Sequence, residues 1–125
     1  MIRKLLALSL LTVPALAQSV PVPLFFAYDG PGANRWLVDN AMHATLERPE
    51  LLPATKRDAK VLEVTVVGKI TRDVGAESKG FSFTLGFYRS GERLGEASEY
   101  CHTDKLSDCA DQLVSDITSA DALRH

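Results

Sequence analysis

The chain has 125 residues, a formal net charge of −2 and a hydrophobic content of 46%. This length and apolar content fit one globular domain with a modest core. Nucleic acid is not predicted as a partner, because its binders need clustered Lys and Arg, and the slight acidic excess gives no attraction to anionic lipid.

The first seventeen residues have the three parts of a secretory signal peptide. Arg3 and Lys4 form a positive start, residues 5–13 are apolar or small, and residues 15–17 form an A-x-A cleavage site. The apolar run is shorter than the roughly 20 residues that span a bilayer, and no later segment is long and apolar enough to do so. A buried N-terminal helix or an uncleaved anchor would be the alternatives. We predict a cleaved signal peptide, one domain over residues 18–125, and export to the periplasm or the extracellular space.

Cys101 and Cys109 are the only cysteines of the chain. An exported protein meets an oxidising compartment, so these two residues are predicted to form a structural disulfide. The bridge would fasten a helix to the edge of a sheet and stabilise the fold by roughly 2.5 kcal/mol. A redox pair would have C-x-x-C spacing and a zinc site would need two further ligands, so no metal or other cofactor is predicted.

The N-terminal half predicts a strand, a helix and a loop. Residues 23–28 form an apolar, aromatic run typical of a strand, and a turn rich in Gly and Pro follows at residues 29–32. A helix is expected to begin after Asn34, which is a good N-cap, and to end before Pro49, which cannot continue it. Residues 49–60 contain two prolines and a charged end, and are expected to form a loop.

The middle of the chain predicts an antiparallel meander. Apolar and polar side chains alternate along residues 61–72 and again along residues 81–88, which is the period of a strand with one buried face. Residues 89–92 have the composition of a hairpin turn. The return strand at residues 93–101 is more polar, so it is predicted to lie at an edge of the sheet.

The last element is predicted to be a helix over about residues 104–123, with Thr103 as a possible N-cap. Its apolar stripe and its acidic stripe lie on opposite faces at 100° per residue. The acidic stripe contains Asp104, Asp108 and Asp111, with Asp116 nearby. The helix is therefore expected to lie on the sheet with an acidic face toward solvent.

The order strand, helix, three strands, helix predicts an α+β fold. We expect a two-layer sandwich with a mainly antiparallel sheet and the helices on one face. The place of the first strand in that sheet stays open.

Three segments resemble the small α+β domains of bacterial envelope proteins, namely the N-terminal domain of TolB and the related domain of the curli secretion pore family. These segments are residues 57–62 (RDAKVL), 67–69 (VGK) and 81–85 (FSFTL), within about half of the mature chain. In that family an R-x-A-D step leads into a strand with a Gly, whereas here the Ala and the acidic residue are in reversed order. The resemblance implies an envelope assembly or partner-binding role, and it carries no catalytic residues to this chain.

No pattern of catalytic residues stands out in the sequence. His102 and Asp104 form a His-x-Asp step, which can bind a metal or set up a base, but without a third ligand the pattern is more typical of a surface loop. Glu96 and Glu99 are an odd number of residues apart, so they are expected on opposite faces of their strand and not as an acid–base pair. The chain is therefore predicted not to be an enzyme.

Binding surfaces are the remaining candidates. One is the acidic stripe of Asp104, Asp108 and Asp111, which would meet a basic partner or would be a plain solvated face. Another is Trp36 with Tyr28 around the turn at residues 29–32, because Trp and Tyr favour interfaces, although a Trp in the first turn of a helix would equally cover the core. A further candidate is the predicted edge strand, which would accept a partner strand unless its charges prevent this.

These features predict a non-enzymatic exported domain that binds another envelope or secreted protein. The alternatives are a small-molecule or lipid carrier, for which 108 residues leave little cavity volume, and an inhibitor or immunity protein of an exported enzyme. The sequence does not specify the partner or the oligomeric state.

Overall fold

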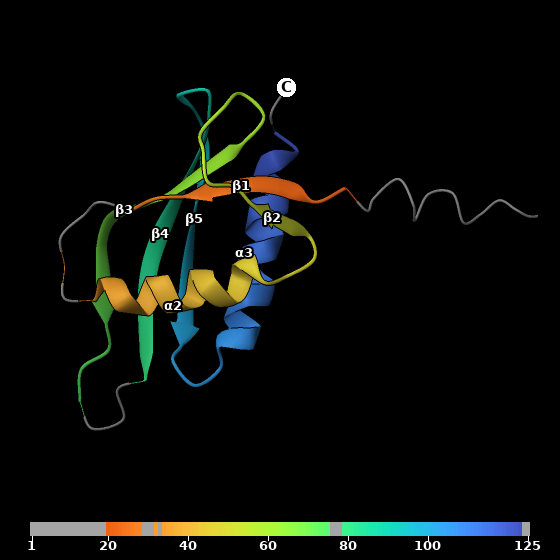
Figure 1. The fold of residues 1–125 in the computed structure, drawn as a ribbon. Helices are drawn as coiled ribbons and strands as arrows, with labels where there is room; N and C mark the ends of the chain where they lie inside the picture. The colour runs from red at the N-terminus through yellow and green to blue at the C-terminus, as the bar shows by residue number, and fades with distance from the viewer. Residues whose placement is uncertain (1–19, 29–31, 33, 76–78, 124–125) are drawn as a thin grey trace, which may run out of the picture.

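Figure 1 shows the fold in a computed structural model, which describes residues 20–28, 32, 34–75 and 79–123. The predicted signal peptide lies outside the described residues. In chain order the elements are β1 (Val22–Phe26), α2 (Arg35–Leu46), β2 (Leu51–Pro53), β3 (Leu62–Arg72), β4 (Gly80–Arg89), β5 (Glu92–His102) and α3 (Leu106–Asp121).

The five strands form one mixed sheet in the order β2-β1-β3-β4-β5. Strands β3, β4 and β5 are the predicted antiparallel meander, and β5 is an edge strand as expected. Strand β1 runs parallel to both β3 and β2, which settles its place in the sheet. The α+β class is confirmed, and the sheet is mixed because α2 carries the chain back across its face between two parallel strands.

The segment after Pro49 is not a loop throughout, as the sequence suggested. Leu51–Pro53 pairs with β1, with Leu51 opposite Val22 and Leu52 opposite Pro23. Backbone hydrogen bonds from Val22 to Glu50 and from Ala54 to Leu24 extend this pairing. The sequence Leu-Leu-Pro is too short to show the alternation of apolar and polar residues that predicts a strand, so its extended conformation depends on pairing with β1.

Side chains of alternating polarity give the meander a core face and an open face. The apolar side chains of β3 and β4 are buried beneath the helices, and Phe81, Leu85 and Phe87 are almost completely enclosed. A bulge between Val67 and Thr71 shifts the register of β3, with Gly68 at φ +76°. The hairpin turn has positive φ at both Ser90 and Gly91, the conformation that suits the twist of a tight hairpin.

Both helices bury an apolar stripe on the same face of the sheet. Helix α2 buries Leu37, Val38, Ala41, Met42 and Thr45. Helix α3 buries Cys109, Ala110, Leu113, Val114, Ile117 and Ala120. The buried hydroxyl of Thr45 donates to the carbonyl of Ala41 at 2.7 Å, so it does not lack a partner.

Neither predicted N-cap side chain caps its helix. The Asn34 amide donates instead to the carbonyl of Ile70 in β3, at 3.0 Å. Thr103 donates both its backbone N–H and its hydroxyl to the carbonyl of Lys79, at 2.7 and 3.1 Å, and α3 begins only at Leu106. Both residues therefore connect the start of a helix to the sheet. A polar side chain at a helix start can donate to a nearby strand carbonyl instead of accepting from the N–H groups of its own helix.

Candidate functional site

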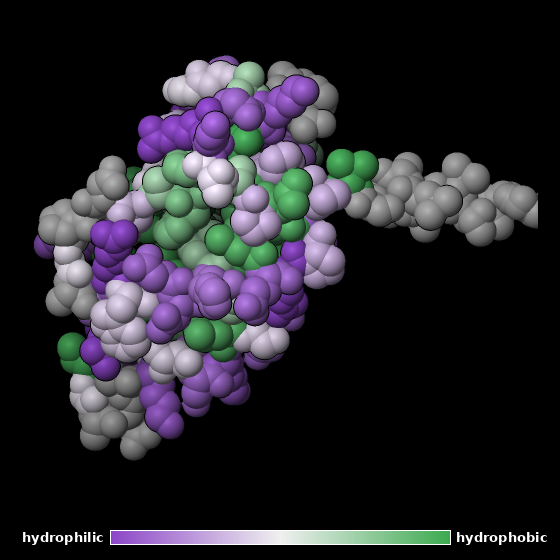
Figure 2. Space-filling model, in the orientation of Figure 1, coloured by the Kyte–Doolittle hydropathy of each residue, from purple (hydrophilic) through white to green (hydrophobic). Residues whose placement is uncertain are grey.

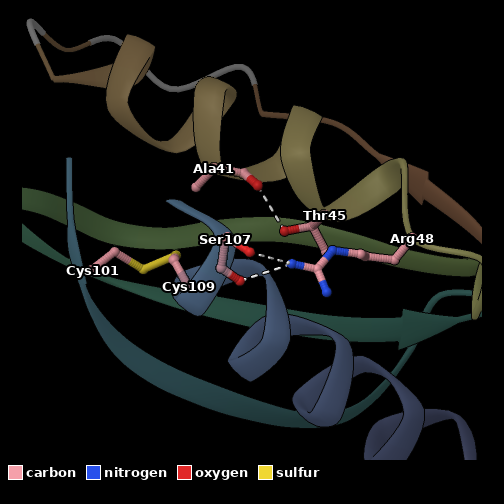
Figure 3. The surroundings of a disulfide bond; sticks show 6 residues. All are labelled: Ala41, Thr45, Arg48, Cys101, Ser107 and Cys109. Carbon is pink, nitrogen blue, oxygen red and sulfur yellow. Dashed lines mark hydrogen bonds between the residues drawn. A yellow bond between two sulfur atoms is a disulfide. The ribbon is translucent and has the colours of Figure 1, made fainter. Parts of the chain in front are cut away.

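The predicted disulfide joins Cys101 at the end of β5 to Cys109 in the second turn of α3. Both cysteines are buried, and their Cα atoms are 5.3 Å apart. Figure 3 shows the bridge holding the start of α3 against the edge strand. We call residues 101–109 the disulfide loop. Because the bridge and the Thr103–Lys79 bonds restrain it, this loop presents its exposed side chains from a fixed backbone.

Trp36 lies beside the disulfide loop. Its side chain, in the first turn of α2, is 49% exposed, and the guanidinium of Arg72 lies 5.8 Å from the ring centre. A small pocket of about 40 Å³ is lined by Trp36, Leu37 and Asn40 of α2, by Phe81 of β4, and by Thr103 and Leu106 at the start of α3. We call the partly exposed members of this set, Trp36, Asn40, Thr103 and Leu106, the Trp36 patch.

The acidic stripe divides into two parts. Asp104 and Asp108 are exposed within the disulfide loop, and neither is in an ion pair with a described residue. Asp111 is held by Arg48, which also donates to the carbonyl and the hydroxyl of Ser107 at 2.8 and 3.1 Å (Figure 3). Arg48 follows α2, so this contact fastens α2 to α3 and leaves Asp104 and Asp108 as the carboxylates next to the Trp36 patch.

Tyr28 does not share the surface of Trp36. The sequence placed both around one turn, but Tyr28 is only 8% exposed and belongs to the core. The guanidinium of Arg35 lies 5.6 Å from its ring centre. An aromatic residue just beyond β1 continues the core side of that strand, which the turn composition alone does not reveal.

A carboxyl pair lies between β5 and α3, where the sequence had placed Asp116 near the solvent-facing acidic stripe. Glu99 sits opposite Phe83 and so faces the helices, whereas Glu96 is paired with Arg93. Asp116 of α3 hydrogen-bonds to Glu99, and burial together with this neighbour raises the pKa of Asp116 to about 7. The Oδ2 atom of Asp116 is buried and has no hydrogen-bond partner among the described residues. Helical spacing from Cys109 and Leu113 puts residue 116 near the buried stripe, and that signal would have found it.

Two open hollows of ligand size lie on the surface of the domain. One, of about 440 Å³, lies on the open sheet face and is lined by Lys69 and by the hydroxyl side chains of Thr71, Ser82, Thr84, Ser98 and Tyr100. A hydrogen bond to Asp73 raises the pKa of Tyr100. The other, of about 480 Å³, lies where β1 begins and α3 ends.

The surface view in Figure 2 adds an apolar area over β1 and β2, between the mainly hydrophilic outer side of α2 and the charged segment that follows β2. Leu52 of the edge strand β2 is among the exposed large apolar residues. Within the part of the chain that the structure describes, no group of three His, Cys, Asp or Glu side chains is arranged to hold a metal ion. None of the described helices is both long and apolar enough to cross a membrane.

These features define a disulfide-bonded α+β domain with a small pocket beside an exposed Trp. No family model and no curated protein matches the chain. Similar solved structures include a minor lipoprotein from Acinetobacter baumannii, with 11% identity, 80% of this chain and 92% of that chain covered, and a TM-score of 0.49.

Two further similar structures were found. TolB from Acinetobacter baumannii has 10% identity and a TM-score of 0.43, with 80% of this chain but only 28% of that chain covered. A dodecamer of a PelC point variant from Paraburkholderia phytofirmans has 14% identity and a TM-score of 0.43, with 84% of this chain and 88% of that chain covered. TolB is one of the proteins that the sequence segments resemble.

Proposed function

We propose that this chain is an exported, non-enzymatic accessory domain that binds another envelope or secreted protein through the Trp36 patch and the disulfide loop. The half-exposed indole of Trp36, at the mouth of a pocket between two elements, carries the proposal. Trp is among the residues that dominate binding energy when a partner covers them, especially in small pockets surrounded by polar groups.

Charge indicates the chemistry of the partner. Asp104 and Asp108 are exposed next to the patch and have no cationic partner among the described residues, whereas Asp111 is already engaged by Arg48. A partner segment with one apolar side chain for the pocket and one or two basic side chains for these carboxylates fits the surface. The disulfide supports the proposal further, because a loop fixed before binding loses little conformational entropy on binding.

Export is part of the same proposal. Residues 1–17 have the pattern of a signal peptide, and a disulfide suits an oxidising compartment such as the periplasm or the extracellular space. An inhibitor or immunity protein would use the same surface, with an exported enzyme as its partner.

Site-specific photocrosslinking tests the proposal. A photoreactive residue at Asn40, inside the Trp36 patch, should crosslink to one exported protein, whereas the same residue at the exposed Ser119 near the other end of α3 should not. With that partner purified, Trp36→Ala should weaken binding at least about 30-fold, the loss of a hot spot of about 2 kcal/mol. Asp104→Lys with Asp108→Lys should also weaken binding.

Two results would contradict the proposal. One is a crosslink of equal yield from both positions. The other is an affinity unchanged by Trp36→Ala in a variant whose circular dichroism matches the parent protein, which is expected because the side chain is half exposed.

A further inference from the structure

The second cavity described above has an unusual arginine in its wall. Arg89, the last residue of β4, has a side chain only 11% exposed. Its Nη2 donates to Oδ1 of Asp121, the last residue of α3, at 2.6 Å, and the Asp121 side chain is 18% exposed. This ion pair joins the end of the helix to the hairpin end of the meander.

The pair leaves much of the guanidinium unsatisfied. Nε and Nη1 of Arg89 are buried, and no described residue accepts a hydrogen bond from either. Together these nitrogens carry three N–H donors of a fixed positive charge. Native proteins almost always satisfy buried donors, and a charged group has the strongest need for an acceptor. The acceptor is therefore expected to come from outside the described residues.

The surroundings of Arg89 indicate which acceptor fits. The cavity of about 480 Å³ falls in the size range of small-molecule sites. Its apolar wall consists of residues 20–23 and Ala59, and its polar wall of Lys60, Arg89 and Asp121. Two cationic side chains against one carboxylate leave a net positive charge, next to a surface made of Val and Pro.

We propose that this hollow, which we call the Arg89 cavity, binds a small organic anion in which one carboxylate is attached to an apolar chain. The carboxylate meets Arg89 and Lys60, and the apolar chain lies along residues 20–23. An inorganic anion would use the cations but leave the apolar wall uncovered, so an amphipathic carboxylate fits better. Helix α3 of 16 residues, about 24 Å long, separates this cavity from the Trp36 patch, so the two sites are independent.

Octanoate is a suitable probe, with 1-octanol as its uncharged counterpart and acetate as its counterpart without an apolar chain. Titration into the purified protein, followed by NMR of backbone amides and of the Arg89 side-chain Nε–H, should give saturable shifts at residues 20–23, 59–60, 89 and 121. Octanoate should bind at least about tenfold more tightly than either control compound, the effect of one charge-assisted contact.

Variants separate the charge from the shape of the cavity. Lys60→Gln should weaken octanoate binding about threefold to fivefold, as for one exposed ionic contact, whereas Lys56→Gln in the same segment but outside the cavity wall should have no effect. Arg89→Met alone would remove the Arg89 ion pair from a largely buried carboxylate and could fail to fold. The double change Arg89→Met and Asp121→Leu removes both charges at similar volume and leaves only Lys60 as a cation, so octanoate should bind at most about fivefold more tightly than 1-octanol.

The proposal is wrong if octanoate and 1-octanol bind equally well, or if the shifts map to another surface. It is also wrong if the folded double variant binds octanoate as the parent protein does.

Discussion

The carboxyl pair between β5 and α3 predicts an unusual dependence of stability on pH. The pKa of Asp116 is raised from an ordinary 3.8 to about 7, because the group is partly buried and faces Glu99. Between these two values the folded protein holds a proton that the unfolded chain releases. The stabilising contribution is therefore complete below about pH 4 and is lost as the pH rises through about 7.

The size of the effect follows from the shift. About three pKa units correspond to roughly 4 kcal/mol, an upper limit for a group fully removed from water. Asp116 is only partly buried, so solvent screening reduces the expected contribution to about 1–2 kcal/mol. For a domain of this size, such a loss lowers the melting temperature by roughly 5 °C between pH 5 and pH 8.

Asp116→Asn isolates this contribution. The amide stays neutral at every pH and donates to Glu99, so the variant should match the parent protein at pH 5. At pH 8 it should be about 1–2 kcal/mol more stable, because the parent then holds two facing carboxylates. Urea unfolding followed by circular dichroism at both pH values measures the difference, with equal m-values as the check on two-state unfolding.

Asp108→Asn is the matched control, since it changes an exposed Asp of the same helix. Its effect on the free energy of unfolding should be the same at pH 5 and pH 8. The reasoning is refuted if Asp116→Asn has the parent's pH dependence, or if it is less stable than the parent at pH 8.

Three further substitutions test the packing. Replacing both Cys101 and Cys109 by Ala should cost about 2.5 kcal/mol of unfolding free energy in urea, and an unchanged value would contradict loop closure as the source of the bridge's stabilisation. Gly80→Ala would place a Cβ 1.8 Å from the Tyr100 hydroxyl, so it should cost about 1–3 kcal/mol, and adding Tyr100→Ala should recover part of that loss. Arg48→Ala should lower the free energy of unfolding by about 1 kcal/mol, as measured in thermal melts, because it removes a contact between α2 and α3. This loss should be smaller than that of the double Cys variant, and equal losses in the two variants would contradict the ranking.

The sequence predicted the meander well because its physics is local. Strict alternation along residues 81–88 requires one buried face whatever the partner strands are, and the Ser90–Gly91 step favours one class of hairpin turn. The disulfide followed from having two cysteines in a chain predicted to be exported, and the structure places them within bonding distance.

What the sequence did not predict depends on distant partners. Strand β2 is extended only because it pairs with β1 through backbone hydrogen bonds. Thr103 does not cap α3, because its hydroxyl donates to the carbonyl of Lys79 instead. Of the candidate site, Trp36 is half exposed, whereas Tyr28 faces the core and Asp111 is bound by Arg48. No local sequence pattern predicts which carboxylate will form an ion pair with an arginine that is distant in the sequence.

The position of β1 has a consequence for the order of folding. The meander connects neighbours through short turns, so its contacts have low sequence separation and form with little loop-closure cost. Strand β1 instead inserts between β2 and β3 and closes a long crossover through α2. We therefore expect the C-terminal meander with its clipped helix to assemble first, and the N-terminal strand to complete the sheet by docking between two parallel neighbours.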